Sequence, residues 1–231
     1  MRPLIAIAAL VIATLTASAA EAGWTYDFYG ITRNSTANTS TGEQQLSVRV
    51  RGLRRNRVEL QFRNTGLEAS SITDVYLDDR NSVFSSIRRI KNSDGVSFSQ
   101  GAAPGNLPGG NNLLDPFQST MGLNADSDPP VQHNGVNPGE KLSIVFNLAS
   151  GKRFWDVISG IQNSVLRIGL HVQGFANGGS ESFVNVNPKN PDGPPIVPEP
   201  TGLALAGIAL GGVLINRRRS KKRDTETDQP E

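Results

Sequence analysis

The stretch "QQLSVRVRGL" (44–53) decides the fold class, because its apolar and polar residues alternate one by one. Leu46, Val48 and Val50 fall on one side of an extended chain, and the residues between them fall on the other. The stretch "RVELQFRN" (57–64) repeats this alternation, and the few residues between the two stretches fit a hairpin connection. The pair predicts two antiparallel strands with one buried face and one exposed face.

The same habit recurs through most of the chain. Glycine (24 residues) and proline (14) are plentiful, whereas aromatic residues make up only 6% of the 231 residues. Many short strands joined by turns favour a sandwich or barrel over a helical bundle. We therefore predict an all-β domain over residues 23–187, an antiparallel β-sandwich of jelly-roll-like type. Its further strands are expected at 24–33, 72–79, 83–90, 141–148, 164–175 and 181–186.

Two segments interrupt the strand pattern. Residues 32–44 are rich in Ser, Thr and Asn and are expected to form a polar loop. Residues 99–140 are too long for an ordinary connection, so we expect either a functional or a disordered segment, and the first place to look for a binding site. The only helix expected in the domain lies near residues 154–164, where Gly160 and β-branched residues weaken the pattern.

Residues 1–22 have the three-part pattern of a secretory signal peptide. Met1 and Arg2 give a positive start, residues 4–17 are apolar, and small residues up to Ala22 offer cleavage sites. The alternative is an uncleaved anchor, although the apolar run is short for a stable span. We expect export and removal of residues 1–22 by signal peptidase. With no cysteine, the exported domain has no disulfides.

The other end of the chain is built for a membrane. A Pro-rich linker (188–197) precedes Pro198, Glu199 and Pro200, and residues 202–215 then carry no charge. As a helix, residues 202–215 would span about 21 Å of a hydrocarbon layer of about 30 Å, a marginal length that the full helix expected over 201–216 extends only slightly. Positive charge stays cytoplasmic, so the basic cluster at 217–223 places the body outside, and an acidic tail (224–231) follows. The residues that define this segment are Gly202, Gly207, Gly211 and Ile215 in the helix and Arg217, Arg218 and Arg219 after it.

Together, the Pro-Glu-Pro motif, the short apolar helix and the arginine cluster resemble the PEP-CTERM sorting signal. The resemblance covers about residues 196–223 and occurs in a chain that starts with a signal peptide. It implies recognition of Pro198, Glu199 and Pro200 by an exosortase, a membrane-embedded thiol transpeptidase of Gram-negative bacteria that make exopolysaccharide. It implies that residues 202–215 are a transient anchor. The hairpin-like stretch 167–185 also resembles a recurring part of such proteins, whose ectodomains carry no assigned activity.

No catalytic motif stands out. The sequence has two histidines, His133 and His171, with no partner at metal-binding spacing, and it has no nucleophile elbow, P-loop or dinucleotide fingerprint. His171 should lie on the outward face of its strand with Arg167 and Gly169. From Trp24 to Ile196 the chain has 16 Lys and Arg against 15 Asp and Glu, so the body is near neutral. A nucleic-acid-binding domain carries its basic patch on the folded part, and we expect no such partner.

Four residues are candidate ligand contacts. Trp24 and Trp155 fit stacking on sugar rings, or they are core residues of the sandwich. Asp126 and Asp128 fit a calcium site on a loop, or they are solvated carboxylates. No structural metal and no other cofactor is expected.

The expected function follows from these parts. We expect a non-enzymatic protein that passes the inner membrane transiently and ends in the cell envelope or outside the cell, associated with exopolysaccharide. The alternatives are a carbohydrate-binding module, calcium-dependent or not, and a permanently anchored single-pass membrane protein.

Overall fold

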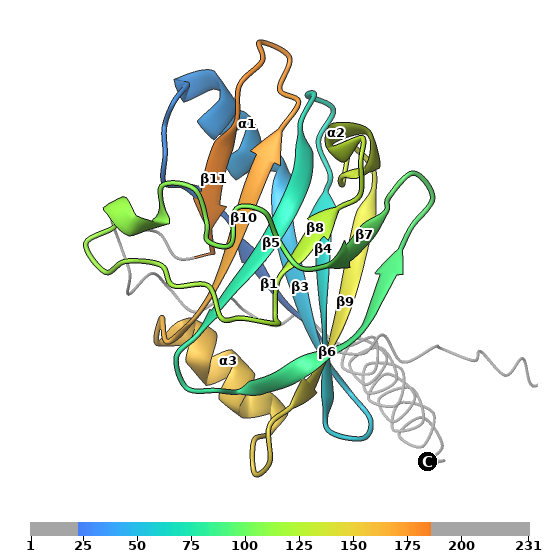
Figure 1. The fold of residues 1–231 in the computed structure, drawn as a ribbon, viewed down its shortest axis with the longest axis vertical. Helices are drawn as coiled ribbons and strands as arrows, with labels where there is room; N and C mark the ends of the chain where they lie inside the picture. The colour runs from blue at the N-terminus through green and yellow to red at the C-terminus, as the bar shows by residue number, and fades with distance from the viewer. Residues whose placement is uncertain (1–22, 186–231) are drawn as a thin grey trace, which may run out of the picture. The chain divides into compact units, whose positions relative to one another are not determined.

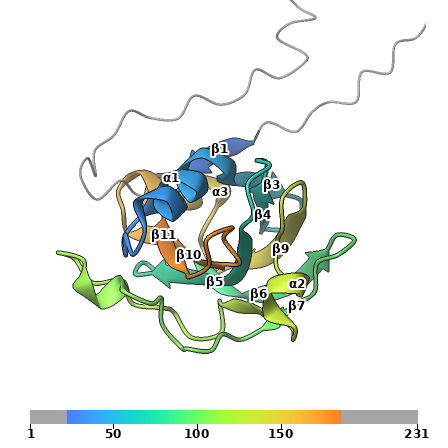
Figure 2. The ribbon, with the colours of Figure 1, turned by 90° about the horizontal axis from the view of Figure 1, so that it is seen from above.

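A computed structural model describes residues 23–185, which form two antiparallel β-sheets packed face to face (Figure 1). Figure 2 looks along the sandwich and shows the two layers. Sheet A has the order β1 (Trp24–Asp27), β3 (Leu46–Leu53), β4 (Arg57–Asn64), β9 (Lys141–Leu148), β6 (Phe84–Asn92). Sheet B has the order β2 (Tyr29–Gly30), β11 (Glu181–Val184), β10 (Leu166–Gln173), β5 (Ser71–Asp79), β8 (Ala125–Ser127), β7 (Phe98–Gln100). The prediction of an all-β sandwich is confirmed.

The core lies between the sheets and contains the residues that the alternation assigned to it. Leu46, Val48 and Val50 of β3 are buried, and so are the inward residues of β4. From the opposite sheet, Ile168 and Leu170 of β10 join the same cluster. Burial of a side chain of this size stabilises the fold by about 1.5–3 kcal/mol, so this two-sided cluster supplies most of the driving force.

The hairpin between β3 and β4 forms as predicted. Leu46 pairs with Asn64 and Leu53 with Arg57, so the two strands match along their full length. At the tip, Arg55 and Asn56 have φ values of 62° and 55°. Two successive left-handed residues match the right-handed twist of the flanking strands. The expected hairpin of β10 and β11 is present too.

The expectation of a loop at 32–44 was wrong, because helix α1 (Thr36–Gln45) occupies most of it. The Ser35 hydroxyl accepts a hydrogen bond from the Asn38 amide, which caps the helix start. The buried carboxylate of Glu181 accepts hydrogen bonds from the amides of Asn34 (3.0 Å) and Ser35 (2.6 Å). Contacts far along the sequence therefore fix a helix that the local composition does not favour.

The remaining helices are short. Helix α3 (Phe154–Gln162) confirms the helix expected near residues 154–164. Helix α2 (Val131–Asn134) and a 3₁₀ turn (Gly110–Asn112) lie in the long connection. None of the helices between residues 23 and 185 is long and apolar enough to cross a membrane. The signal peptide, the linker and the sorting segment predicted from the sequence lie outside the described residues.

The long connection covers the outer face of sheet B. Leu107 and Phe117 from this connection pack with Tyr76 of β5 and Val184 of β11 in a second apolar cluster. Every residue of β5 is consequently buried, whereas alternation predicted one exposed face. Arg167 of β10 fastens the connection: its guanidinium donates to the Asp115 carbonyl (2.8 Å) and the Pro116 carbonyl (2.6 Å). The connection is thus a packed layer and contributes the short strands β7 and β8.

Candidate functional site

Trp24 and Trp155, which are 131 positions apart in the sequence, meet on the surface. Their ring centroids lie 6.0 Å apart with the planes at 83°, an edge-to-face arrangement. Phe154 adds a third ring, 5.7 Å from that of Trp155. We call Trp24, Phe154 and Trp155 the aromatic cluster. Trp155 is 64% exposed, whereas Trp24 and Phe154 are partly buried against the core.

The fold fixes this cluster from two directions. Trp24 lies on the edge strand β1 opposite Val50, which aims its ring along the inner side of sheet A. Helix α3 begins at Phe154, and its start is fixed by a hydrogen bond from the Arg153 amide to the Asp156 carboxylate (2.6 Å). Phe154 packs on Gly52 of β3, where an added Cβ would lie 3.1 Å from the ring. Trp155 follows directly and is held outward by these two supports.

An exposed tryptophan on fixed supports is a ready contact surface. Its ring has little conformational freedom to lose on binding, because Trp24 and Phe154 already restrict it. A flat apolar ring with a polar N–H suits ligands that have an apolar face and a polar edge, as sugar rings do. Of the two interpretations open from the sequence, core packing describes Trp24 in part, and ligand contact suits Trp155.

Asp126 occupies a different site, on the outer face of sheet B. Register places Asp74 of β5 opposite Asp126 on one side and opposite His171 on the other. Asp74 is buried and accepts hydrogen bonds from Thr73 (2.8 Å) and Tyr76 (3.3 Å), and its Oδ2 lies 3.1 Å from His171 Nδ1. His171 is therefore a partnered histidine on the outward face of its strand, as the alternation predicted.

Burial raises the pKa of Asp126 to about 6, and the neighbouring Asp74 carboxylate adds to the effect through its charge and a hydrogen bond. The same causes raise the pKa of the Tyr76 hydroxyl. Two carboxyl groups in direct contact favour sharing one proton between them. Glycosidases instead hold their two carboxyl groups about 5 Å or more apart across a cleft. The hydrogen bond between Asp74 and Asp126 differs from that arrangement and favours the protonated form of Asp126.

Asp128 has its own partners. Its carboxylate accepts a hydrogen bond from the Ser97 hydroxyl (2.6 Å), and hydrogen bonds from Ser97 and Ser99 lower its pKa. Asp126 and Asp128 therefore have different hydrogen-bond partners. Asp126 has Asp74 and two backbone groups, whereas Asp128 has Ser97 and Ser99. Within residues 23–185, no group of three or more acidic, histidine or cysteine side chains is arranged to hold a metal ion.

Sequence reasoning missed two members of these sites. Phe154 was expected only as part of a helix, although its position beside Trp155 was the available signal. Asp74 lies in the middle of an apolar-rich strand, and a carboxylate at such a position hints at a buried partner. The sorting residues Pro198, Glu199 and Pro200, the helix residues Gly202, Gly207, Gly211 and Ile215, and the basic residues Arg217, Arg218 and Arg219 lie outside the described residues.

Comparisons with known proteins add no relative. No protein-family model, no curated protein sequence and no solved structure matches this chain.

Proposed function

We propose that this chain is an exported, non-enzymatic β-sandwich protein of the cell envelope or extracellular matrix, and that it contacts polysaccharide through its aromatic cluster. The observation that carries the proposal is the exposure of Trp155 on the support of Trp24 and Phe154. Trp155 is the most exposed aromatic side chain of residues 23–185, in a domain that buries most of its other large rings.

The sequence supports the location in this proposal. A signal peptide over residues 1–22 and a PEP-CTERM-like segment over 198–223 would deliver the ectodomain through the inner membrane to an exosortase-type transpeptidase. By the same resemblance, the neighbour outside is exopolysaccharide of a Gram-negative bacterium. The second possibility, a permanently anchored single-pass protein, shares the ectodomain and differs only in the fate of the tail.

The binding half of the proposal is tested with neutral polysaccharides. We expect the full chain to be retarded in affinity gels that contain a neutral glucan or xylan, and Trp155→Ala to weaken that binding by about tenfold, the loss of one central aromatic contact. In a Trp24→Phe variant, Trp155 is the remaining tryptophan, so its fluorescence should shift on binding. Repeating the binding assay with added calcium and with a chelator shows whether the polysaccharide binding depends on calcium.

Leu114→Ala is the matched control, because Leu114 is a fully exposed apolar side chain on the long connection. It should leave binding unchanged. Equal binding by the wild type and Trp155→Ala, or equal loss in both variants, would rule out the aromatic cluster as the contact surface.

A further inference from the structure

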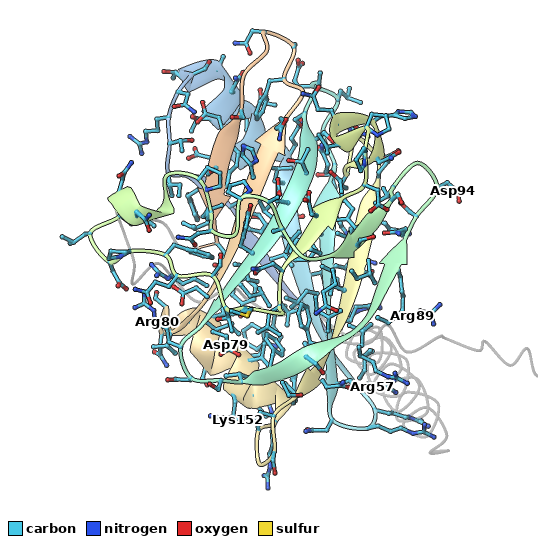
Figure 3. All side chains as sticks on the ribbon, in the orientation of Figure 1. Arg57, Asp79, Arg80, Arg89, Asp94 and Lys152 are labelled. Carbon is cyan, nitrogen blue, oxygen red and sulfur yellow. The ribbon has the colours of Figure 1, made fainter. Side chains whose placement is uncertain are left out.

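The outer face of sheet A contains a hollow of about 420 Å³ lined by basic side chains. We call it the basic hollow. It lies outside the aromatic cluster and plays no part in the function proposed above. Figure 3 shows Arg57 and Arg89 projecting from the same side of the molecule. Its lining residues are Leu53, Arg57, Arg88, Arg89, Lys91 and Val145.

A β-bulge creates this arrangement. Ile87 of β6 pairs with Phe146 of β9, and Arg89 pairs with the next residue, Val145, so Arg88 is an extra residue in the ladder. A bulge of this kind turns two neighbouring side chains toward one face. Ile87 and Ile90 pack against the core, and both arginines between them line the hollow. Strict alternation would have placed one of these arginines against the core.

The hollow holds more positive charge than the neighbouring carboxylate of Glu59 neutralises. Glu59 accepts hydrogen bonds from Lys91 (2.9 Å) and from Arg51. Burial raises the pKa of Glu59, but these two partners outweigh that effect and lower it, so the carboxylate stays charged. Among residues 23–185, no carboxylate lies within ion-pair distance of Arg57, Arg88 or Arg89. Three guanidinium groups of the hollow therefore have no carboxylate partner in the described part of the chain.

The whole outer face of sheet A shares this character, although the body is near neutral. Alternation and register place two acidic residues there, Glu59 and Asp27. Several of the domain's other carboxylates, such as Asp74, Asp78 and Glu181, are buried elsewhere. The basic residues on this face are Arg49, Arg51, Arg57, Arg63, Arg88, Arg89, Lys91 and Lys141.

We propose that the basic hollow binds an acidic group, a carboxylate or sulfate, of an anionic polysaccharide that runs along the outer face of sheet A. Guanidinium groups in pairs match the oxygens of such groups. Val145 and Leu53 give an aliphatic surface beneath the charges, which suits the carbon skeleton of a sugar ring. Further basic side chains along the strands would meet the next acidic groups of the polymer.

Two other polyanions fit the hollow less well. A lipid surface is bound by basic residues together with exposed apolar side chains that enter the bilayer. The large exposed apolar residues of the described chain, Leu67, Leu114, Met121 and Trp155, do not line the hollow. A single-stranded nucleic acid calls for aromatic platforms on which bases stack, and no aromatic residue lines it.

The test compares the full chain with Arg88→Gln/Arg89→Gln. Both arginines are exposed on the edge strand β6, so the variant should keep the wild-type Tm. We expect wild type to bind polygalacturonate or dextran sulfate, and the variant to bind about tenfold more weakly at about 50 mM salt, with the difference shrinking at higher salt. The two polymers separate carboxylate from sulfate preference. Arg89→Gln alone serves if the double variant fails to fold.

The matched control is Arg63→Gln/Lys141→Gln, a directly opposed pair further along the same face that removes the same charge. It should weaken binding much less. Equal loss in both double variants would overturn the hollow as the site, because only a diffuse field would remain. Binding unchanged in Arg88→Gln/Arg89→Gln also overturns the proposal. The proposal is also overturned if Arg88→Gln/Arg89→Gln loses more affinity for phosphatidylglycerol vesicles or single-stranded DNA than for the acidic polysaccharides.

Trp155→Ala separates this proposal from the function proposed above. It should keep wild-type affinity for the acidic polymers while losing neutral ones. Charge-dependent binding that disappears with Trp155→Ala would place both ligands at the aromatic cluster and overturn a separate basic hollow.

Discussion

Asp126 faces Asp74 across two neighbouring strands, and this single contact has a consequence for pH. The pKa of Asp126 is about 6 in the fold against a usual value of 3.8. The folded state therefore holds the proton more tightly than the unfolded state. The stabilisation is complete below about pH 4 and is lost as the pH rises to about 6. Tyr76 and His171 also face Asp74, so they share this environment.

We expect Asp126→Asn, which keeps an uncharged side chain at every pH, to remove this dependence. The difference in Tm between Asp126→Asn and wild type should grow in favour of the variant by about 2–4 °C from pH 4 to pH 7. That corresponds to about 1 kcal/mol for a domain of this size, a figure discounted because Asp126 is partly solvent-exposed. Thermal melts at several pH values measure it. Parallel Tm curves for the two proteins would contradict the role given to Asp126.

At the residue scale, the sequence identified candidate site residues, but it did not show which residues they contact. Trp155 and Trp24 were candidate ligand contacts from their type alone. Their contact depends on the register of β1 against β3 and on the placement of α3, neither of which a local pattern contains. Asp126 was expected on a loop with Asp128, yet its partner is Asp74, which is distant in the sequence. Pairings across strands were beyond a single sequence.

At the scale of elements, the long connection 99–140 behaves as part of the fold. The side chain of Arg167 carries much of this attachment: it pairs with Asp78, donates to two carbonyls of the connection and lies 5.3 Å from the Phe117 ring centroid. Breaking one member of a buried ion pair leaves the other charge stranded. The long connection is thus held by Arg167, a residue that the alternation of its strand predicted to be on a solvent-exposed face.

Arg167→Met should therefore destabilise the domain and loosen the connection. We expect the free energy of unfolding to fall by about 3 kcal/mol, the lower end of the usual cost of breaking a buried ion pair. The lower end applies because Arg80 still contacts Asp78 (3.3 Å). Urea unfolding gives the loss, and limited proteolysis should cut first between β7 and β8. Arg54→Met, in the exposed β3–β4 turn, is the control and should cost almost nothing. Unchanged proteolysis would show that apolar packing alone holds the connection.

Alternation predicted the long strands well, and it failed where tertiary contacts replaced solvent. β5 reads as half-exposed because its outward residues include Asp74 and Asp78, which the connection and Arg167 cover. Helix α1 lacks an apolar face, and its support comes from Glu181 and from Phe183 packed on Gly42. Alternation in the sequence therefore predicts the strands of the sheets. It does not predict the segments that cover them or the contacts that hold helix α1, because these depend on residues distant in the sequence.

At the scale of the whole molecule, the fold separates basic from acidic residues that are mixed along the sequence. The body counts as near neutral, yet the outer face of sheet A is basic and several acidic residues are buried. A sum over the chain cannot show this, because alternation sends neighbouring residues to opposite faces. Within the described residues, the two proposed contact surfaces are thus an aromatic cluster for neutral sugars and a basic hollow for acidic ones.

The delivery that we propose for this domain would depend on the terminal signals predicted from the sequence. Changing Pro198, Glu199 and Pro200 to alanine should leave a longer, membrane-retained form, since the resemblance makes these residues the recognition motif of the exosortase. Intact-mass measurement of membrane and released fractions measures it in the native host. Equal mature mass and equal release for both proteins would contradict sorting. A wild-type chain that keeps its tail would support the permanently anchored alternative.

The bulged strand β6 has one more consequence, for solubility. It forms an outer edge of sheet A, and an open edge can pair with the edge of a second copy. Two register breaks and the closely spaced charges of Arg88, Arg89 and Lys91 make β6 a poor template for such pairing. Because the chain has no cysteine, no disulfide restrains its misassembly. The irregularity that shapes the hollow thereby also discourages edge-to-edge aggregation.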